Sequence, residues 1–135
     1  MKKIISLLLA GIMLLSVMTI GCVGVSAAQT HTSGDYNYQF VEDSETVKIT
    51  AYTGKNTDLE IPSTLDGYEV SEIGNGAFYI NKTLEYVTLP DTIKKIGSDA
   101  FKLTDIVEIT FNDNLTHIGS LAFYNCTKLK KSKTS

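Results

Sequence analysis

Ile96-Gly97-Ser98-Asp99-Ala100-Phe101 is the middle one of three copies of a single phrase in this chain of 135 residues. The other copies are residues 73–78 and 118–123, so the pattern I-G-x-x-A-F recurs after steps of 23 and then 22 residues. A fixed period in the twenties is typical of a solenoid, in which each unit buries its apolar face only against its neighbours. The sequence therefore predicts a short stack of coils, which offers a long surface more often than a deep cleft.

A second shared pattern precedes each copy of the phrase. Residues 59–62, 87–90 and 109–112 read L-E-I-P, V-T-L-P and I-T-F-N, with apolar and polar residues alternating. Such alternation of β-branched residues predicts short strands whose apolar side chains point into the stack. The glycine of each I-G pair is expected to supply the turn into a brief helical or 3-10 segment, and the phenylalanines should form a column of rings. The predicted structural core is Ile73, Phe78, Val87, Leu89, Ile96, Phe101, Ile109, Phe111, Ile118 and Phe123.

Together these patterns resemble the BspA-type leucine-rich repeats of secreted and surface proteins in bacteria and some protists. The resemblance is carried by L-x-x-V-x-L-P followed by I-G-x-x-A-F-x-x-C-x-x-L, which residues 118–129 match well, and it covers about residues 36–129. It implies a mainly β fold with short helical or 3-10 turns, built as a right-handed leucine-rich-repeat solenoid of about three repeats. In that fold a parallel sheet forms one face and irregular turns form the other. The resemblance also implies adhesion or protein binding, although its motifs are more specific for the fold than for an activity.

The predicted domain organisation starts with an export signal. In residues 1–27, Lys2 and Lys3 precede an apolar run that ends near a small-residue cleavage site, which is typical of a secretory signal peptide. An uncleaved membrane anchor and lipidation at Cys22 remain as alternatives. All three interpretations predict a secreted or cell-surface protein that meets a membrane only through this segment.

The remaining chain divides into four segments. Residues 28–35 are a polar leader that we expect to be disordered, and residues 36–57 read as a capping β-hairpin at the N-terminal side of the stack. Residues 58–129 hold the leucine-rich repeats. Residues 130–135 are expected to be a solvated basic tail, which leaves the last coil without a visible cap. The chain is therefore either a truncated array or one whose last coil is covered by something else.

Charge and cysteine content exclude some functions. After cleavage at Ala27, ten lysines and fifteen acidic residues remain, so the net charge is about −5. Nucleic acid is excluded as a partner because it requires a concentrated basic face. Loss of Cys22 with the signal leaves Cys126 alone, so no intrachain disulfide can form, and we expect Cys126 to be a small buried residue.

No catalytic, metal or cofactor site is predicted. His117 occupies a slot that holds Lys95 and Glu72 in the other units, which indicates a solvated surface position. His31 lies in the leader without a second ligand nearby, and the carboxylates are too scattered to single out an acid and base pair. Gly74 recurs in the other units and therefore reads as a turn glycine rather than part of a phosphate loop. We accordingly predict that the protein is not an enzyme and needs no cofactor.

The outward face of the predicted strands is the candidate binding surface. Tyr86 is its single aromatic residue, and tyrosines often anchor interfaces. The alternative is that tyrosine and threonine merely suit an exposed sheet by β-propensity. The chain contains no Arg and no Trp, which favours weak, multivalent binding. The candidate residues form two rows, Asp58, Tyr86 and Glu108 in the first and Glu60, Thr88 and Thr110 in the second.

These observations predict an exported interaction module that binds a protein or cell-surface ligand through the strand face. A second hypothesis is a structural array unit that associates end to end through its uncapped last coil, around Phe123 and Leu129. A third is an accessory domain of a larger surface protein or enzyme.

Overall fold

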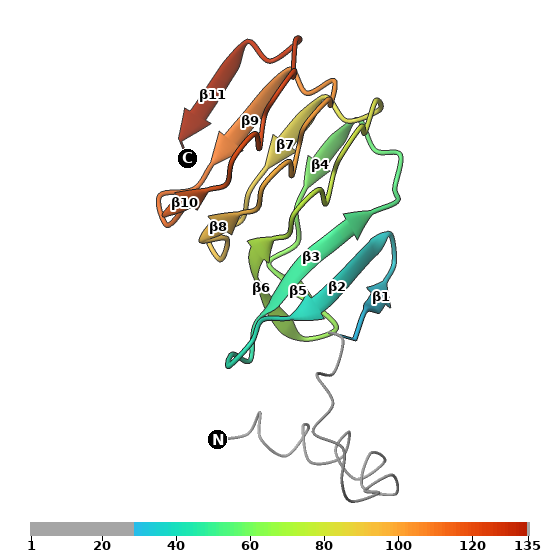
Figure 1. Cartoon of the computed structure of the whole chain (residues 1–135), viewed down its shortest axis with the longest axis vertical. Helices are drawn as coiled ribbons and strands as arrows, with labels where there is room; N and C mark the ends of the chain where they lie inside the picture. The colour runs from blue at the N-terminus through green and yellow to red at the C-terminus, as the bar shows by residue number, and fades with distance from the viewer. Residues whose placement is uncertain (1–28, 135) are drawn as a thin grey trace, which may run out of the picture.

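The computed structural model of the chain describes residues 29–134 (Figure 1). The predicted signal segment, with its alternatives of an anchor and of lipidation at Cys22, lies outside the described residues. The described residues form a mainly β solenoid of short strands without helices. Its coils are stacked along the long axis of the molecule, with the N-terminal strands at one end and the last coil at the other.

The predicted strand layer is a parallel sheet of four strands. Each strand phrase contributes one strand, and these are β4 (Asp58–Glu60), β7 (Tyr86–Thr88) and β9 (Glu108–Phe111). They pair in the order β11-β9-β7-β4, in line with the repeat period. Leu59, Val87 and Ile109 point inward from these strands and are buried. The alternation in the sequence therefore specifies both the strands and their inward face.

The fourth strand of this sheet, β11 (Lys131–Thr134), corrects one prediction. These residues were expected to be a solvated tail, but they pair in parallel with β9, with Lys131 opposite Glu108. The repeat period places the next strand at this position, and the unpaired backbone groups of β9 provide hydrogen-bond partners for any sequence that is not proline. A polar composition therefore does not prevent strand formation here.

The second sheet has seven strands and lies on the other side of the coils. It is formed by β1 (His31–Ser33), β2 (Tyr36–Phe40), β3 (Val47–Tyr52), β5 (Thr64–Leu65), β6 (Tyr68–Ile73), β8 (Lys95–Ile96) and β10 (His117–Ile118). The strand order is β1-β2-β3-β6-β8-β10, with β5 paired to β6. The isoleucines of the I-G pairs thus end the strands of a second sheet, where the family pattern suggested only irregular turns.

The structure of the N-terminal region confirms the predicted hairpin and corrects the prediction of a disordered leader. Strands β2 and β3 are antiparallel, and β3 continues the sheet by pairing in parallel with β6. The leader was expected to be disordered, but β1 pairs antiparallel with β2. Two contacts explain its order: the His31 ring stacks on Tyr38 at 5.3 Å between centroids, and the Ser33 hydroxyl donates to Asp66 at 2.7 Å.

Asp66 also fastens the hairpin to the first coil. Its second carboxylate oxygen accepts a hydrogen bond of 2.8 Å from the Tyr38 hydroxyl. Burial, together with this hydrogen bond, raises the pKa of Tyr38 to about 12. The hydrogen bonds from Ser33 and Tyr38 lower the pKa of Asp66 below its usual value. The carboxylate is therefore favoured in its charged form where the leader, the hairpin and the first coil meet.

A continuous column of aromatic rings fills the interior. Phe78 and Phe101 stack at 4.8 Å between centroids, and Phe101 and Phe123 at 5.3 Å, with ring planes 10° and 4° apart. Tyr52 of the hairpin extends the column, at 5.4 Å from Phe78. The predicted column is thus confirmed, and it begins in the hairpin.

The predicted core is buried except in the last coil and at Phe111. Phe111 and Phe123 are only partly buried, and Ile118 is 46% exposed, so its prediction as a core residue is wrong. The physical reason is that the described residues contain no further coil to cover it. The other predicted core residues are buried, namely Ile73, Phe78, Val87, Leu89, Ile96, Phe101 and Ile109.

The turns after each glycine are not helical, because some of their backbone hydrogen bonds run to the next coil and others close turns within the same coil. The N–H groups of Phe78 and Phe101 donate to the next coil, at Ala100 O and Ala122 O, both at 2.8 Å. Intervening groups close tight turns within the same coil, as from Asn81 N to Phe78 O at 3.1 Å. Donors directed to a neighbouring coil cannot close a helical ladder, so the predicted helical or 3-10 segments are replaced by a ladder of turns.

Candidate functional site

The predicted binding residues lie on one continuous surface, which we define as the strand face. Asp58, Tyr86 and Glu108 are direct Cα partners across β4, β7 and β9, and Glu60, Thr88 and Thr110 form the adjacent row. Neighbouring strands in a sheet are about 4.8 Å apart, so each row is a closely spaced ladder. The structure therefore brings together all six residues that the sequence singled out.

Exposure and charge vary along the strand face. Tyr86 is 44% exposed, Asp58, Glu60 and Thr88 are also exposed, and Glu108 and Thr110 are partly buried. The acidic residues of the two rows lie on β4 and β9, whereas β11 continues the rows with Lys131 and Lys133 in register. The strand face is thus acidic around Tyr86 and changes to a basic sequence at its C-terminal edge.

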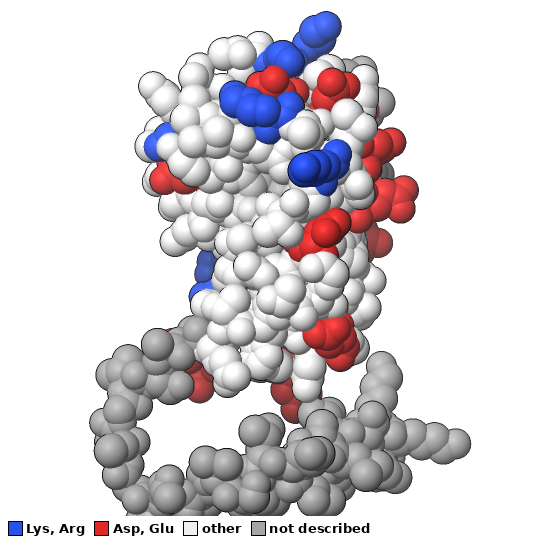
Figure 2. Space-filling model, turned by 90° about the vertical axis from the view of Figure 1, so that its right-hand side faces the viewer, with Lys and Arg blue, Asp and Glu red and all other residues white. Residues whose placement is uncertain are grey.

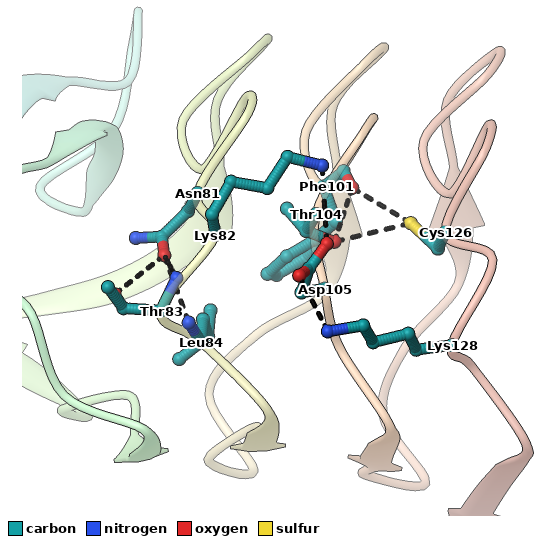
Figure 3. Close-up of polar contacts among 9 residues, drawn as sticks. All are labelled: Asn81, Lys82, Thr83, Leu84, Phe101, Thr104, Asp105, Cys126 and Lys128. Atoms are coloured by element: carbon teal, nitrogen blue, oxygen red, sulfur yellow. Dashed lines mark hydrogen bonds and ion pairs between the residues drawn. The ribbon is translucent and has the colours of Figure 1, made fainter.

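The turns that lead into the four-stranded sheet form a second surface, the turn edge. Figure 2 shows that uncharged atoms cover much of this side, that lysines gather toward the C-terminal coils, and that acidic side chains continue along one margin of the stack. Asp105 accepts from Lys82 at 3.2 Å and from Lys128 at 2.8 Å, which links three successive coils (Figure 3). These two ammonium groups lower the pKa of Asp105 and Asp105 raises the pKa of Lys128. We interpret this triad as a clamp between coils.

A ladder of equivalent polar positions lies beside this clamp. Asn81 Oδ1 accepts hydrogen bonds from the backbone N–H groups of Thr83 and Leu84, both at 3.0 Å, which stabilises the turn before β7. Cys126 is partly buried, and its thiol donates to Phe101 O at 2.9 Å (Figure 3). We expected Cys126 to be a small buried residue. It is instead a partly buried, hydrogen-bonded side chain that links the third coil to the second.

The turn edge also carries an aromatic row that the sequence reasoning missed. Lys102 Nζ lies 5.9 Å from the centroid of Tyr79 and 5.8 Å from that of Tyr124, and its ion pair with Asp99 is 2.8 Å long. Tyr79 is 49% and Tyr124 57% exposed. All three row members directly follow the A-F pair of their unit, so an alignment of the repeats was sufficient to find them.

A groove on the seven-stranded sheet was also missed. It is lined by a row of polar side chains that includes Lys48, Glu72, Lys95 and His117. His117 is exposed, as predicted. The repeat comparison identified the shared slot of the last three residues, but it did not reveal that the hairpin adds Lys48 to the same row, because the parallel pairing of β3 with β6 is a tertiary contact.

Within residues 29–134, no group of His, Cys, Asp and Glu side chains is arranged to hold a metal ion. The same residues contain no helix with the length and apolar composition that a bilayer crossing requires.

Comparison with known proteins agrees with this architecture. A crystal structure of a leucine-rich cell surface protein from Faecalibacterium prausnitzii is 34% identical, with a TM-score of 0.69 over 79% of this chain and 31% of that one. A leucine-rich repeat protein from T. pallidum is 21% identical with a TM-score of 0.54, over 77% of this chain and 71% of that one. A leucine-rich repeat protein from Bacteroides capillosus is 19% identical with a TM-score of 0.53, over 78% of this chain and 98% of that one.

The chain thus spans about a third of the F. prausnitzii protein, and the likeness to the other two proteins shows the fold alone. No match was found among curated protein sequences. The family model described as the BspA type leucine rich repeat region matches residues 45–135. The chain, with its three I-G-x-x-A-F coils, belongs to the BspA-type leucine-rich repeat family.

Proposed function

We propose that this protein is an exported interaction module that binds a protein at a cell surface or in the extracellular space through its strand face. The alignment of Asp58, Tyr86 and Glu108 in one row is the observation that carries this proposal. A large, exposed tyrosine between acidic side chains supplies an anchor and a polar rim, which is the arrangement that protein interfaces use.

Export is part of the same proposal. The first residues read as a signal segment, and the F. prausnitzii relative is described as a cell surface protein. Since the chain spans about a third of that relative, an accessory domain within a larger surface protein is an alternative context for the same interaction.

Replacement of Tyr86 by alanine tests the strand face. In biolayer interferometry on immobilised extracellular matrix extract, Tyr86→Ala should weaken binding at least about tenfold, which is the loss of a typical hot spot. Tyr79→Ala is the matched control because Tyr79 is similarly exposed, at 49% against 44%, but lies on the turn edge. Unchanged binding by Tyr86→Ala would remove the strand face from the proposal, and a loss confined to Tyr79→Ala would move the site to the turn edge.

End-to-end self-association is a second candidate, favoured by the surface of the last coil. Ile118 is 46% and Leu121 54% exposed, and both correspond to positions that a following coil would cover or border. Phe78 and Phe101 each donate their N–H to the next coil, and the described residues hold no further coil to accept from Phe123. A second molecule could supply this missing neighbour.

Light scattering distinguishes this candidate from the first. If the last coil self-associates, the measured mass rises with protein concentration, and Leu121→Glu abolishes the rise by adding a charge to the contact. A wild-type protein that keeps the monomer mass at millimolar concentration eliminates the candidate without affecting the test of Tyr86.

A further inference from the structure

A polar groove crosses the outer face of the seven-stranded sheet and shares no residue with the strand face. Its volume is about 450 Å³. One row of side chains runs along it, because Gln39 pairs with Lys48, Lys48 with Glu72, Glu72 with Lys95, and Lys95 with His117. The row thus crosses five strands and follows the axis of the solenoid, which is the geometry of a site for an extended chain rather than for a compact molecule.

The groove is locally basic in a protein that is acidic overall, with a formal net charge of −3. Among its lining residues, Lys48 and Lys95 face a single acid, Glu72. Glu72 is already paired with Lys95, at 3.4 Å, and no carboxylate of the described residues forms an ion pair with Lys48. An anionic ligand is therefore the one that matches the charge of the groove.

The chemistry of the lining indicates a hydrophilic ligand. Gln39, Thr50, Asn75 and Ser98 add amide and hydroxyl groups, and none of the residues that line the groove is Phe, Tyr or Trp. Sites for drug-like molecules and for peptide anchors are mostly apolar, with a few polar groups. A chain rich in hydroxyl groups fits this lining better than a peptide, because it can form hydrogen bonds along its whole length and needs no apolar pocket.

The spacing of the two lysine positions sets where an extended ligand can be held. The Cα atoms of Lys48 and Lys95 are separated by two strand intervals, which is about 10 Å, and Glu72 lies on the strand between them, with its carboxylate 3.4 Å from Lys95 Nζ. Linked sugar rings that carry a carboxylate on alternate rings present acid groups at about this separation. In an extended peptide, side chains on one face repeat about every 7 Å, which does not match the two lysines.

We propose that this groove binds an acidic polysaccharide with one carboxylate on every second sugar ring. Lys48 binds one carboxylate, and Lys95 leaves its exposed ion pair with Glu72 to bind the next, both through charge-assisted hydrogen bonds. Glu72 accepts hydroxyl donors from the uncharged ring between them and repels a carboxylate placed there. The groove thus selects alternating acids and discriminates against chains that carry an acid on every unit.

Binding to defined polymers tests this proposal by microscale thermophoresis with the purified protein. The probe is a hyaluronan decasaccharide, which has a glucuronate on alternate rings. Polygalacturonate, poly-glutamate and dextran serve as the densely charged, peptide and neutral comparisons. Lys48→Gln combined with Lys95→Gln should weaken hyaluronan binding at least about tenfold, since hydrogen bonds to two charged groups are lost. Added salt should weaken it as well, because both contacts are exposed to screening.

The matched control is Lys55→Gln combined with Lys130→Gln, which removes the same two positive charges from exposed positions outside the groove. Its hyaluronan affinity should stay within about twofold of wild type. Glu72→Gln should raise the affinity for polygalacturonate more than that for hyaluronan, and a merely structural role for Glu72 would not change this ratio.

Three results would overturn the proposal. The first is wild-type protein that binds none of the polymers at low salt. The second is equal weakening by the control variant Lys55→Gln with Lys130→Gln, which would indicate unspecific charge attraction. The third is poly-glutamate binding as tight as hyaluronan binding, which would make the groove a site for acidic peptides.

Discussion

Phe101 shows how single side chains stabilise the stack. It is fully buried, and it touches a ring on each side, Phe78 at 4.8 Å and Phe123 at 5.3 Å. Phe123 has the same role in the sequence pattern but is only partly buried, because it lies in the last described coil. The same residue type at the same repeat position therefore contributes a different amount to stability, depending on the side chains around it.

We expect Phe101→Ala to lower the free energy of unfolding by about 3–5 kcal/mol, the usual range for a phenylalanine deleted from a core. Phe123→Ala should cost clearly less, because solvent already reaches its ring. Denaturant titration of both variants and the wild type measures the difference. A cost below about 1 kcal/mol for Phe101→Ala would contradict the ring column.

Asp105 predicts a pH dependence of stability. Its pKa is lowered by the ammonium groups of Lys128 and Lys82, from an ordinary value of 3.8. Since the folded pKa lies below the unfolded one, the contribution is fully present above the unfolded value and is lost as the pH falls through the folded value. Asp105→Asn should therefore be less stable than the wild type at pH 7, and the difference should shrink below about pH 4.

Thermal unfolding at several pH values measures this difference. Asp113→Asn is the control, because Asp113 is exposed and forms no ion pair among the described residues. A stability difference between Asp105→Asn and the wild type that stays constant from pH 7 to pH 2.5 would show that the carboxylate does not act through its charge.

Glycine determines how closely one coil can follow another. A Cβ atom at Gly97 would lie 2.6 Å from Asn75 Oδ1 and 2.7 Å from the Asn75 backbone nitrogen. Gly97 N also donates to Ile73 O at 2.7 Å, so the two coils cannot separate without loss of this bond. Gly76 differs, since its φ is +63° but the space around it is nearly open, and Asp99 and Leu121 adopt the same conformation in the following units.

Gly97→Ala should therefore destabilise the protein by about 3 kcal/mol, the upper part of the range for overpacking in a rigid site. Gly76→Ala should cost only about 1–2 kcal/mol, because it introduces a left-handed residue without a clash. Equilibrium unfolding in urea compares the two. Wild-type stability for Gly97→Ala would mean that the coils are not packed as closely as described.

The repeats made the strands and the interior predictable from the sequence. The two ends of the stack were not predictable in this way. The burial of Val87 and Phe101 could be predicted because each has counterparts at the same position of the other units, in the same environment. The order of His31 depends on a stacking contact with Tyr38, and the strand at Lys131 depends on the free edge of β9. No local pattern encodes those two contacts. The rows of the strand face could be predicted because the repeat period sets the register of the strands. The groove could not be predicted, because it depends on the tertiary pairing of Lys48 with Glu72.

Three surfaces with different chemistry result from this single stack. The strand face is acidic around Tyr86, the groove is basic around Lys48 and Lys95, and the turn edge presents tyrosines on either side of Lys102. Each surface repeats one position of the coil, so all three depend on the coils being in register. If the strand face and the groove each bind a ligand as proposed, one molecule engages both at once, and such multivalency compensates for weak individual contacts.

Ring-to-ring nuclear Overhauser effects between labelled phenylalanines test the shared interior of the coils most directly. The stack predicts strong effects between Phe78 and Phe101 and between Phe101 and Phe123, whose centroids are 4.8 and 5.3 Å apart. It predicts no direct effect between Phe78 and Phe123, because Phe101 lies between them. Absence of the two adjacent effects in the folded protein, or a direct contact between the outer rings, would contradict the stacked coils and every surface derived from them.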